Sequence, residues 1–178
     1  MNLPKTPGRT TPAFGFSYVG RSLKDCLRRR QFGAAEKSAV VDFFQRWEAQ
    51  PSCAYCGNPN ANRWDHIVPV ANDGATVLGN MVLACSSCDD SKQHRSFDDW
   101  MLSDAPKSPS HQGGANVSKR IEHIKAYVRK FDYESEPIEA GMDKVERERL
   151  QAIRGRLASL RQEVDSLVSD FRRRTRFR

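Results

Sequence analysis

The sequence is poor in apolar residues. Hydrophobic residues make up 38% and aromatic residues 9% of its 178 positions, whereas charged residues make up 29%. No stretch approaches the roughly 20 consecutive apolar residues of a membrane-spanning helix, and no apolar signal peptide opens the chain. We therefore expect no membrane contact, a cytoplasmic protein of prokaryotic or phage origin, and a thin, surface-rich architecture.

Cysteines are few, and their spacing argues against a disulfide framework. Four of the five form two Cys-x-x-Cys pairs, Cys53 with Cys56 and Cys85 with Cys88, which leaves Cys26 over. In a reducing compartment such pairs bind metal ions. Four thiolates in two short knuckles are typical of a closed, structural Zn²⁺ site. Unpaired core thiols are the alternative interpretation.

Acidic residues are outnumbered by basic ones. The chain has 29 Lys and Arg against 22 Asp and Glu, a net charge of +7. Such a balance favours a polyanionic partner, because Lys and Arg bound to phosphates release counterions. We predict DNA as the partner, with RNA not excluded, although solvated surface charge gives the same composition. The predicted contacts are Lys92, Arg28, Arg29, Arg30, Arg172, Arg173 and Arg174.

The insert between the two cysteine pairs, residues 57–84, exceeds the about 15 to 20 residues usual in a zinc ribbon. Within it, residues 63–68 read as a short strand stopped by Pro69, and residues 72–74, Asn-Asp-Gly, mark a turn. Residues 81–84 read as a returning strand, and residues 89–102 as an amphipathic helix. The predicted fold is therefore small and α+β: two strands and a helix around one zinc ion, with flanking helices.

These residues resemble the HNH endonuclease family, whose ββα-metal finger is closed in many members by four cysteines. The resemblance is carried by Asp65-His66, by Asn80 five residues before Cys85, and by a polar residue after Cys88 with Lys92 three further on. It covers residues 53–101 and implies a nuclease of a phage, a mobile element or an anti-phage defence system.

The resemblance also implies roles for single residues. His66 matches the family's general base, Asp65 and Asp89 match ligands of one Mg²⁺ or Mn²⁺, and Asn80 matches an orienting residue in the loop between the strands. Asp89 departs from the pattern, because the family usually has Asn or His there. A carboxylate is still a hard oxygen ligand, so the departure bears on metal preference more than on activity.

The chemistry agrees with these roles. A neutral imidazole serves as a base near pH 7, and a divalent ion stabilises the charge on a phosphate under attack. Adjacent residues on a strand point to opposite faces, so we expect a bulge or a strand end at Asp65-His66. The alternative interpretations for single residues are that His66 is simply buried and that Asp89 caps a helix. The alternative for the whole chain is a non-catalytic zinc-finger adaptor that recruits a partner protein.

The flanks are predicted to contain several helices. We expect an extended arm over residues 1–20, in which alternating Phe14, Phe16 and Tyr18 dock as an edge strand. The remaining expectations are basic and amphipathic helices over 21–50, the nuclease domain over 51–102, a linker over 103–118, an amphipathic helix over 119–133, a heptad helix over 142–171 and a basic tail over 172–178.

The heptad helix has apolar residues at alternating spacings of three and four. Such a seam predicts a coiled coil with a second copy or with another protein, and Gly155 inside it makes the helix dependent on a partner. Folding back onto the chain's own helices is the alternative. The seam comprises Leu150, Ile153, Leu157, Leu160, Val164, Leu167 and Phe171.

Overall fold

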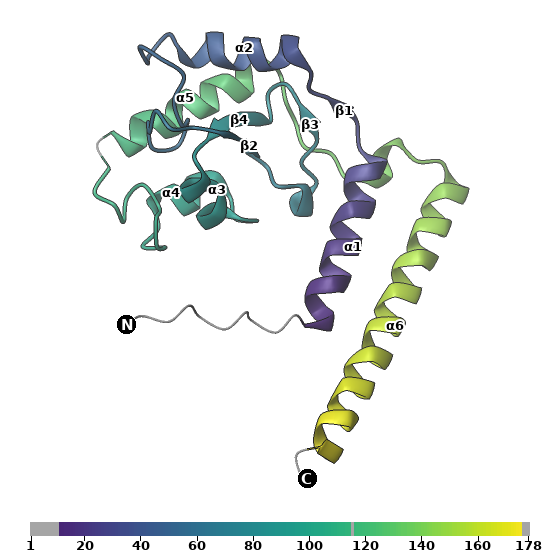
Figure 1. The fold of residues 1–178 in the computed structure, drawn as a ribbon. Helices are drawn as coiled ribbons and strands as arrows, with labels where there is room; N and C mark the ends of the chain where they lie inside the picture. The colour runs from purple at the N-terminus through teal and green to yellow at the C-terminus, as the bar shows by residue number, and fades with distance from the viewer. Residues whose placement is uncertain (1–10, 115, 176–178) are drawn as a thin grey trace, which may run out of the picture. The chain divides into compact units, whose positions relative to one another are not determined.

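The computed structural model describes residues 11–114 and 116–175, and its elements are labelled in Figure 1. The chain divides into two compact units, one formed by the described residues of Met1–Leu23 and Glu139–Arg178, the other by Lys24–Ile138. The small α+β class expected from the sequence is confirmed. None of the helices in the described part of the chain has the length and apolar character that crossing a bilayer needs.

The Lys24–Ile138 unit is built around a short antiparallel pair of strands. Strand β2 (Arg63–His66) pairs with β4 (Met81–Ala84), with His66 opposite Met81. A second, two-residue ladder joins β1 (Arg30–Gln31) in parallel with β3 (Thr76–Val77), and Arg30 lies opposite Thr76. This second ladder was not predicted, because two residues are too few to show periodicity.

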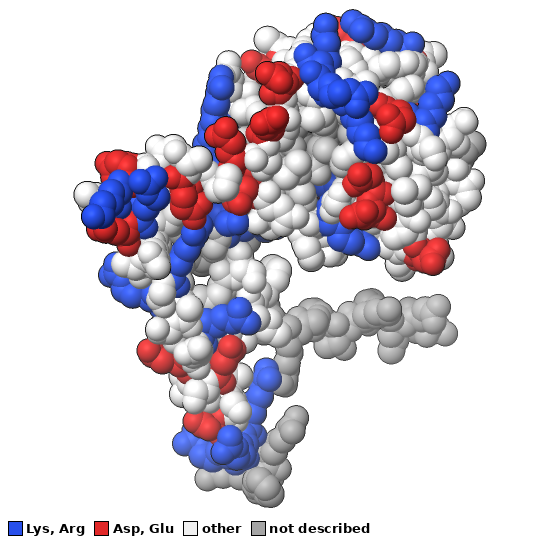
Figure 2. Space-filling model, turned by 180° about the vertical axis from the view of Figure 1, so that it is seen from behind, with Lys and Arg blue, Asp and Glu red and all other residues white. Residues whose placement is uncertain are grey.

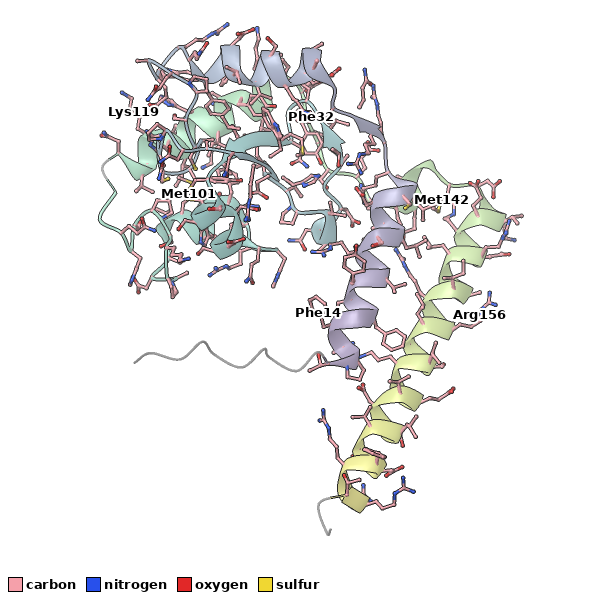
Figure 3. The ribbon with its side chains drawn as sticks, in the orientation of Figure 1. Phe14, Phe32, Met101, Lys119, Met142 and Arg156 are labelled. Carbon is pink, nitrogen blue, oxygen red and sulfur yellow. The ribbon has the colours of Figure 1, made fainter. Side chains whose placement is uncertain are left out.

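Helices surround this strand pair. They are α2 (Ala34–Phe44), α3 (Ser86–Lys92), α4 (Phe97–Leu102) and α5 (Val117–Lys130), with the short 3₁₀ turn η1 (Val70–Asn72). A second 3₁₀ turn, η2 (Ile138–Gly141), begins at the last residue of this unit. The apolar faces of the helices meet in one core, in which Tyr55, Trp100, Met101 and Tyr127 have no exposed surface. Met101 points into this interior in Figure 3.

The other unit contains helix α6 (Lys144–Thr175) and most of α1 (Pro12–Leu27). Helix α6 has 32 residues, of which only Leu150 is buried. It continues through Arg172, Arg173 and Arg174, so these residues end a helix and do not begin a separate tail. The rest of the predicted tail, residues 176–178, lies outside the described residues.

The extended arm predicted over residues 1–20 is wrong for residues 12–20, which are helical. Pro12 occupies the first helical position, where its missing N–H costs nothing. Phe14 and Tyr18 are four residues apart and share one exposed face, so their alternation with Phe16 reflects a helix and not a strand. Residues 1–10 of the arm lie outside the described residues.

The single helix predicted over residues 89–102 is also wrong. The chain forms two short helices, α3 and α4, separated at Gln93, whose φ of 55° is incompatible with a continuing helix. Helix α2 likewise ends at Phe44, before the predicted end at residue 50. In the predicted linker, Ser108 is fully buried, and its hydroxyl donates to the carbonyl of Ser103.

Candidate functional site

The four paired cysteines meet at one point. Cys53 and Cys56 lie in the turn that precedes β2, Cys85 follows β4, and Cys88 lies in α3. Their sulfur atoms are all within 4.8 Å of one another, and those of Cys56 and Cys85 are 3.8 Å apart. A tetrahedral Zn²⁺ with bonds of about 2.3 Å separates its sulfurs by about 3.8 Å. The cluster therefore fits a structural zinc ion.

The ionisation of these thiols also fits a metal site. Hydrogen bonds from Cys53 and Cys88 lower the pKa of Cys56 to about 4. The same contacts raise the pKa of Cys88, through its hydrogen bonds with Cys53 and then Cys56. The thiolate of Cys56 is thus favoured, while the pKa values of Cys53 and Cys88 are raised. A cation between the sulfurs is what allows all four to ionise.

The second group of functional side chains begins at the end of β2. The strand ends at His66 with a regular register, so the expected strand end is present and no bulge is needed. Asp65, one residue earlier, is only 8% exposed. Its Oδ2 accepts a hydrogen bond from the hydroxyl of Tyr55 at 2.7 Å and lies 3.1 Å from the ammonium of Lys92.

Lys92 is fully buried, and this corrects the phosphate contact predicted for it. Its ammonium donates to the backbone carbonyl of His66 at 2.6 Å besides pairing with Asp65. An amine with no exposed surface does not reach a nucleic-acid backbone. Lys92 instead ties α3 to the end of β2, where it fixes both the Asp65 carboxylate and the His66 main chain.

The imidazole of His66 is held by Thr76. Its Nε2 lies 2.9 Å from Oγ1 of Thr76, the β3 residue that pairs with Arg30 of β1. Burial lowers the pKa of His66 below its usual value. The ring is therefore neutral near pH 7, and in the tautomer in which Nε2–H donates to Thr76 its Nδ1 is free to accept a proton.

Asn80 is buried in the loop that returns to β4. Its Oδ1 accepts from the backbone N–H of Val68, and its Nδ2 donates to the carbonyls of Val68 and Ala75. The backbone carbonyl of Asn80 in turn accepts from the N–H of Ile67. These bonds join the residues after His66 to the approach to β4, so Asn80 sets the shape of the loop between the strands.

Asp89 lies in the first turn of α3, directly after Cys88. Its Oδ2 is 2.9 Å from a guanidinium nitrogen of Arg63, which also pairs with Asp90 at 2.6 Å. The charge of Asp89 contributes to the raised pKa of Asp65, of which burial is the larger cause. The two carboxylates therefore lie close enough to interact electrostatically, from β2 and from α3.

The arginines predicted to contact nucleic acid differ in how exposed their side chains are. The side chain of Arg28 is 8% exposed and is engaged by Asp73 and by the carbonyl of Glu136, which corrects the prediction that it contacts phosphate. Arg29 and Arg30 are exposed. Basic side chains also gather at the end of α6 in Figure 2, where Arg172, Arg173 and Arg174 are exposed.

Comparison with known families identifies this arrangement. Residues 53–95 match the HNH endonuclease family. The matched HNH segment contains the four cysteines, Asp65-His66, Asn80 and Asp89, so the predicted resemblance is confirmed. Searches of curated proteins and of solved structures gave no match to the chain.

Three side chains of the HNH segment escaped the sequence-based prediction of the site. Tyr55, between the first two cysteines, bonds Asp65. Arg63, the first residue of β2, pairs with Asp89, and Thr76 holds His66. Arg63 and Asp65 are two residues apart on one strand and so share a face. That spacing was a readable signal for Arg63, whereas the contacts of Tyr55 and Thr76 depend on how the loops fold.

Proposed function

We propose that this chain is a metal-dependent endonuclease that hydrolyses phosphodiester bonds of DNA and acts within a larger assembly. His66 is the general base, Asp65 and Asp89 hold one Mg²⁺ or Mn²⁺, and Asn80 orients the loop that carries the base. The observation behind this proposal is a neutral imidazole at the end of β2, in a segment that matches the HNH family and that also carries carboxylates on β2 and α3.

The carboxylates fit a hard divalent cation. Within the described residues, Tyr55 and Lys92 bond only Oδ2 of Asp65, and Arg63 bonds only Oδ2 of Asp89. Each Oδ1 is therefore available as a ligand, and oxygen is the donor that Mg²⁺ and Mn²⁺ prefer. When bound, such an ion stabilises the negative charge on the phosphate and on the leaving oxygen.

The chain's own part in the reaction is proton transfer and orientation. Nδ1 of His66 takes a proton from a water molecule, whose oxygen bonds to phosphorus as the bond to the leaving 3′ oxygen breaks. Thr76 fixes the ring through Nε2. Lys92 fixes the backbone at His66 itself, and Asn80 fixes it two residues further on, at Val68.

Arginines on the surface supply contacts to the DNA backbone. Arg30 is 69% exposed at its side chain and lies opposite Thr76 in the β1–β3 ladder. Its charge is among those that act on the His66 ring. Arg30 is thus suited to hold a phosphate near the base. Arg29 and the exposed arginines at the end of α6 add contacts that are independent of base sequence.

A non-catalytic nucleic-acid adaptor is the second candidate function. It is favoured by the cations that already face both carboxylates, Lys92 at Asp65 and Arg63 at Asp89. These pairs neutralise the acidic side chains without a metal ion. A binding module of this kind would keep the zinc cluster and the exposed arginines and would not cut DNA.

Plasmid cleavage separates the two functions. We expect the protein to nick or linearise supercoiled DNA in Mg²⁺ or Mn²⁺ and not in EDTA. The substitution His66→Ala should lower the rate by about 10² to 10⁴, the usual contribution of a general base. His94→Ala is the matched control, because His94 is an exposed histidine of the same segment, and it should cut at the unsubstituted rate.

Two results would count against the enzyme. Metal-dependent cutting that His66→Ala leaves intact places the base elsewhere. DNA binding without cutting, by a protein that contains one zinc ion per chain, establishes the adaptor.

A further inference from the structure

Helix α6 carries an apolar seam that its own unit leaves largely uncovered. Of the seven seam residues only Leu150 is buried, while Ile153, Leu160, Leu167 and Phe171 are 38%, 48%, 69% and 55% exposed. Counting Leu150 as heptad position a, the a positions are 150, 157, 164 and 171, and the d positions are 153, 160 and 167. The d positions form the most exposed row.

Contacts inside the unit cover the a side of the seam more than the d side: Leu150 is buried, and Leu157 and Val164 are half-buried. A surface hollow at the start of α1 is lined by Thr11 and Pro12 and, from α6, by Asp165, Val168, Ser169, Arg172 and Arg173. In the heptad these five α6 residues are at positions b, e, f, b and c, and none is at position g. Position g, on the far side of the seam from e, is therefore open next to the exposed d row.

The charged residues at the g positions change sign along the helix, from basic to acidic. The g positions carry Arg149 and Arg156 in the first half of the seam and Glu163 and Asp170 in the second half. All four are exposed, and Arg156 projects from α6 into solvent in Figure 3. In the described chain, Asp170 has an ion pair with Arg173, whereas Arg149, Arg156 and Glu163 have none.

We propose that α6 binds α6 of a second copy of this chain in antiparallel orientation. In an antiparallel pair each a residue packs against a d residue, and g positions face g positions. Setting Leu157 against Leu160 of the second copy brings Arg156 to Glu163, and Arg149 to Asp170. Two-fold symmetry repeats each of these attractive pairs. Flanking charges of this kind set partner and orientation in coiled coils.

The same charges disfavour the other arrangements of two copies. In a parallel dimer g faces the e position five residues on, which sets Arg149 against Arg154 and Arg156 against Arg161. An antiparallel pair shifted by one heptad sets Glu163 against its own symmetry mate. Like charges in such positions oppose association, so the sequence of the g row selects one orientation and one register.

The proposed arrangement contains one kind of unfavourable contact, between Arg154 and Arg161 of opposite copies at the e positions, and two-fold symmetry repeats it. Both side chains already have acidic partners in their own chain. Arg154 pairs with Glu139, and Arg161 lies 3.7 Å from Asp165. These pairs reduce the repulsion, whereas three of the four g residues, Arg149, Arg156 and Glu163, have no ion pair within the described chain.

Charge reversal in the full-length chain tests both association and orientation. By analytical ultracentrifugation we expect a dimer. Arg156→Glu and Glu163→Arg should each weaken it by about tenfold or more, which corresponds to about 1.4 kcal/mol. The double variant, in which the pair is restored with its signs exchanged, should return to within about threefold of the original affinity. Gln162→Glu, at outward position f, is the matched control and should change little.

Opposite results overturn the proposal. In a parallel dimer Arg156→Glu would face Arg161 and would strengthen association. A chain that stays monomeric at about 100 μM, far above the Kd expected of a stable dimer, excludes the second copy as the occupant. Far-UV circular dichroism and zinc content verify folding, since both substituted residues are exposed.

Cross-linking gives an independent measurement. In a Cys26→Ser background, Arg156→Cys and Glu163→Cys proteins should form a disulfide when mixed, and Arg156→Cys alone should not. Leu157→Cys alone should stay unlinked, because a residues meet each other only in the parallel form. A disulfide between two Leu157→Cys chains contradicts the antiparallel pair.

Discussion

At the scale of single residues, the site depends on the buried pair of Asp65 and Lys92, whose ionisation depends on the balance between burial and mutual attraction. Burial raises the pKa of Asp65 and lowers that of Lys92, so desolvation drives both groups towards their neutral forms. Their mutual attraction and the hydroxyl of Tyr55 act in the opposite direction. The pair therefore contributes little net stability, and its main effect is to hold Oδ2 of Asp65 in place.

Removing the ammonium of Lys92 should be costly. Lys92→Met keeps the length of the side chain but leaves the Asp65 carboxylate buried with only Tyr55 as a partner. We expect the free energy of unfolding in urea to fall by about 3 kcal/mol, the lower end of the range for breaking a buried pair. Lys130→Met, at an exposed lysine of α5, should stay within about 0.5 kcal/mol.

Adding Asp65→Asn to Lys92→Met distinguishes electrostatics from packing. If the uncompensated carboxylate causes the loss, the double variant should recover more than half of it. A double variant that unfolds as easily as Lys92→Met would show that the ammonium matters for other reasons, such as its bond to the His66 carbonyl.

His66 should titrate below the usual histidine value of about 6.5, because burial disfavours its charged form. The unfolded chain takes up this proton near pH 6.5 and the folded chain only at lower pH. This residue therefore lowers the free energy of unfolding as the pH falls below about 6.5. An NMR titration of the ring, assigned by loss of its signal in His66→Gln, gives the pKa; a value at or above 6.5 contradicts this prediction.

At the scale of elements, the sequence predicted those helices and strands whose position is set by metal ligands or by a long repeat of apolar residues. The cysteine knuckles, the two strands of the insert and the long final helix were all readable, because ligand spacing and heptads constrain many residues at once. The first part of α1, residues 12–20, was missed because Pro12 and the nearby glycines resemble a loop. The contacts of Lys92 were missed because burial of a lysine is decided by its surroundings and not by its type.

The backbone of Gln93, between α3 and α4, is strained, and this strain can be tested by substitution. Gln93 has φ 55° and ψ −118°, a conformation that favours glycine. Gln93→Gly should raise the free energy of unfolding by about 1 kcal/mol, since relief of backbone strain exceeds the entropic cost of glycine. Gln45 follows α2 with an ordinary φ of −62°. Gln45→Gly should lower stability, and equal effects at the two positions would show that Gln93 is unstrained.

At the scale of the whole molecule, the zinc cluster and the core of the Lys24–Ile138 unit are one structure. Cys53, Cys85 and Cys88 belong to the same buried cluster as Tyr55 and Trp100. The rings of Tyr55 and Trp100 pack edge to face with their centroids 5.3 Å apart. The strand that carries Asp65 and His66 runs between the two cysteine pairs. Loss of the metal should therefore disrupt the core and the candidate active site together.

Metal removal tests this coupling. The protein should contain one zinc ion per chain, and a strong chelator should abolish the near-UV circular dichroism of buried Tyr55 and Trp100. Added Zn²⁺ should restore the signal and Mg²⁺ should not, because thiolates prefer the softer ion. Cys85→Ser should behave like the chelated protein, whereas Cys26→Ser, at an exposed cysteine outside the cluster, should not. A folded, zinc-free chain with its aromatic signal intact would show that apolar packing alone holds β2 and α3 in place, and with them His66, Asp65 and Asp89.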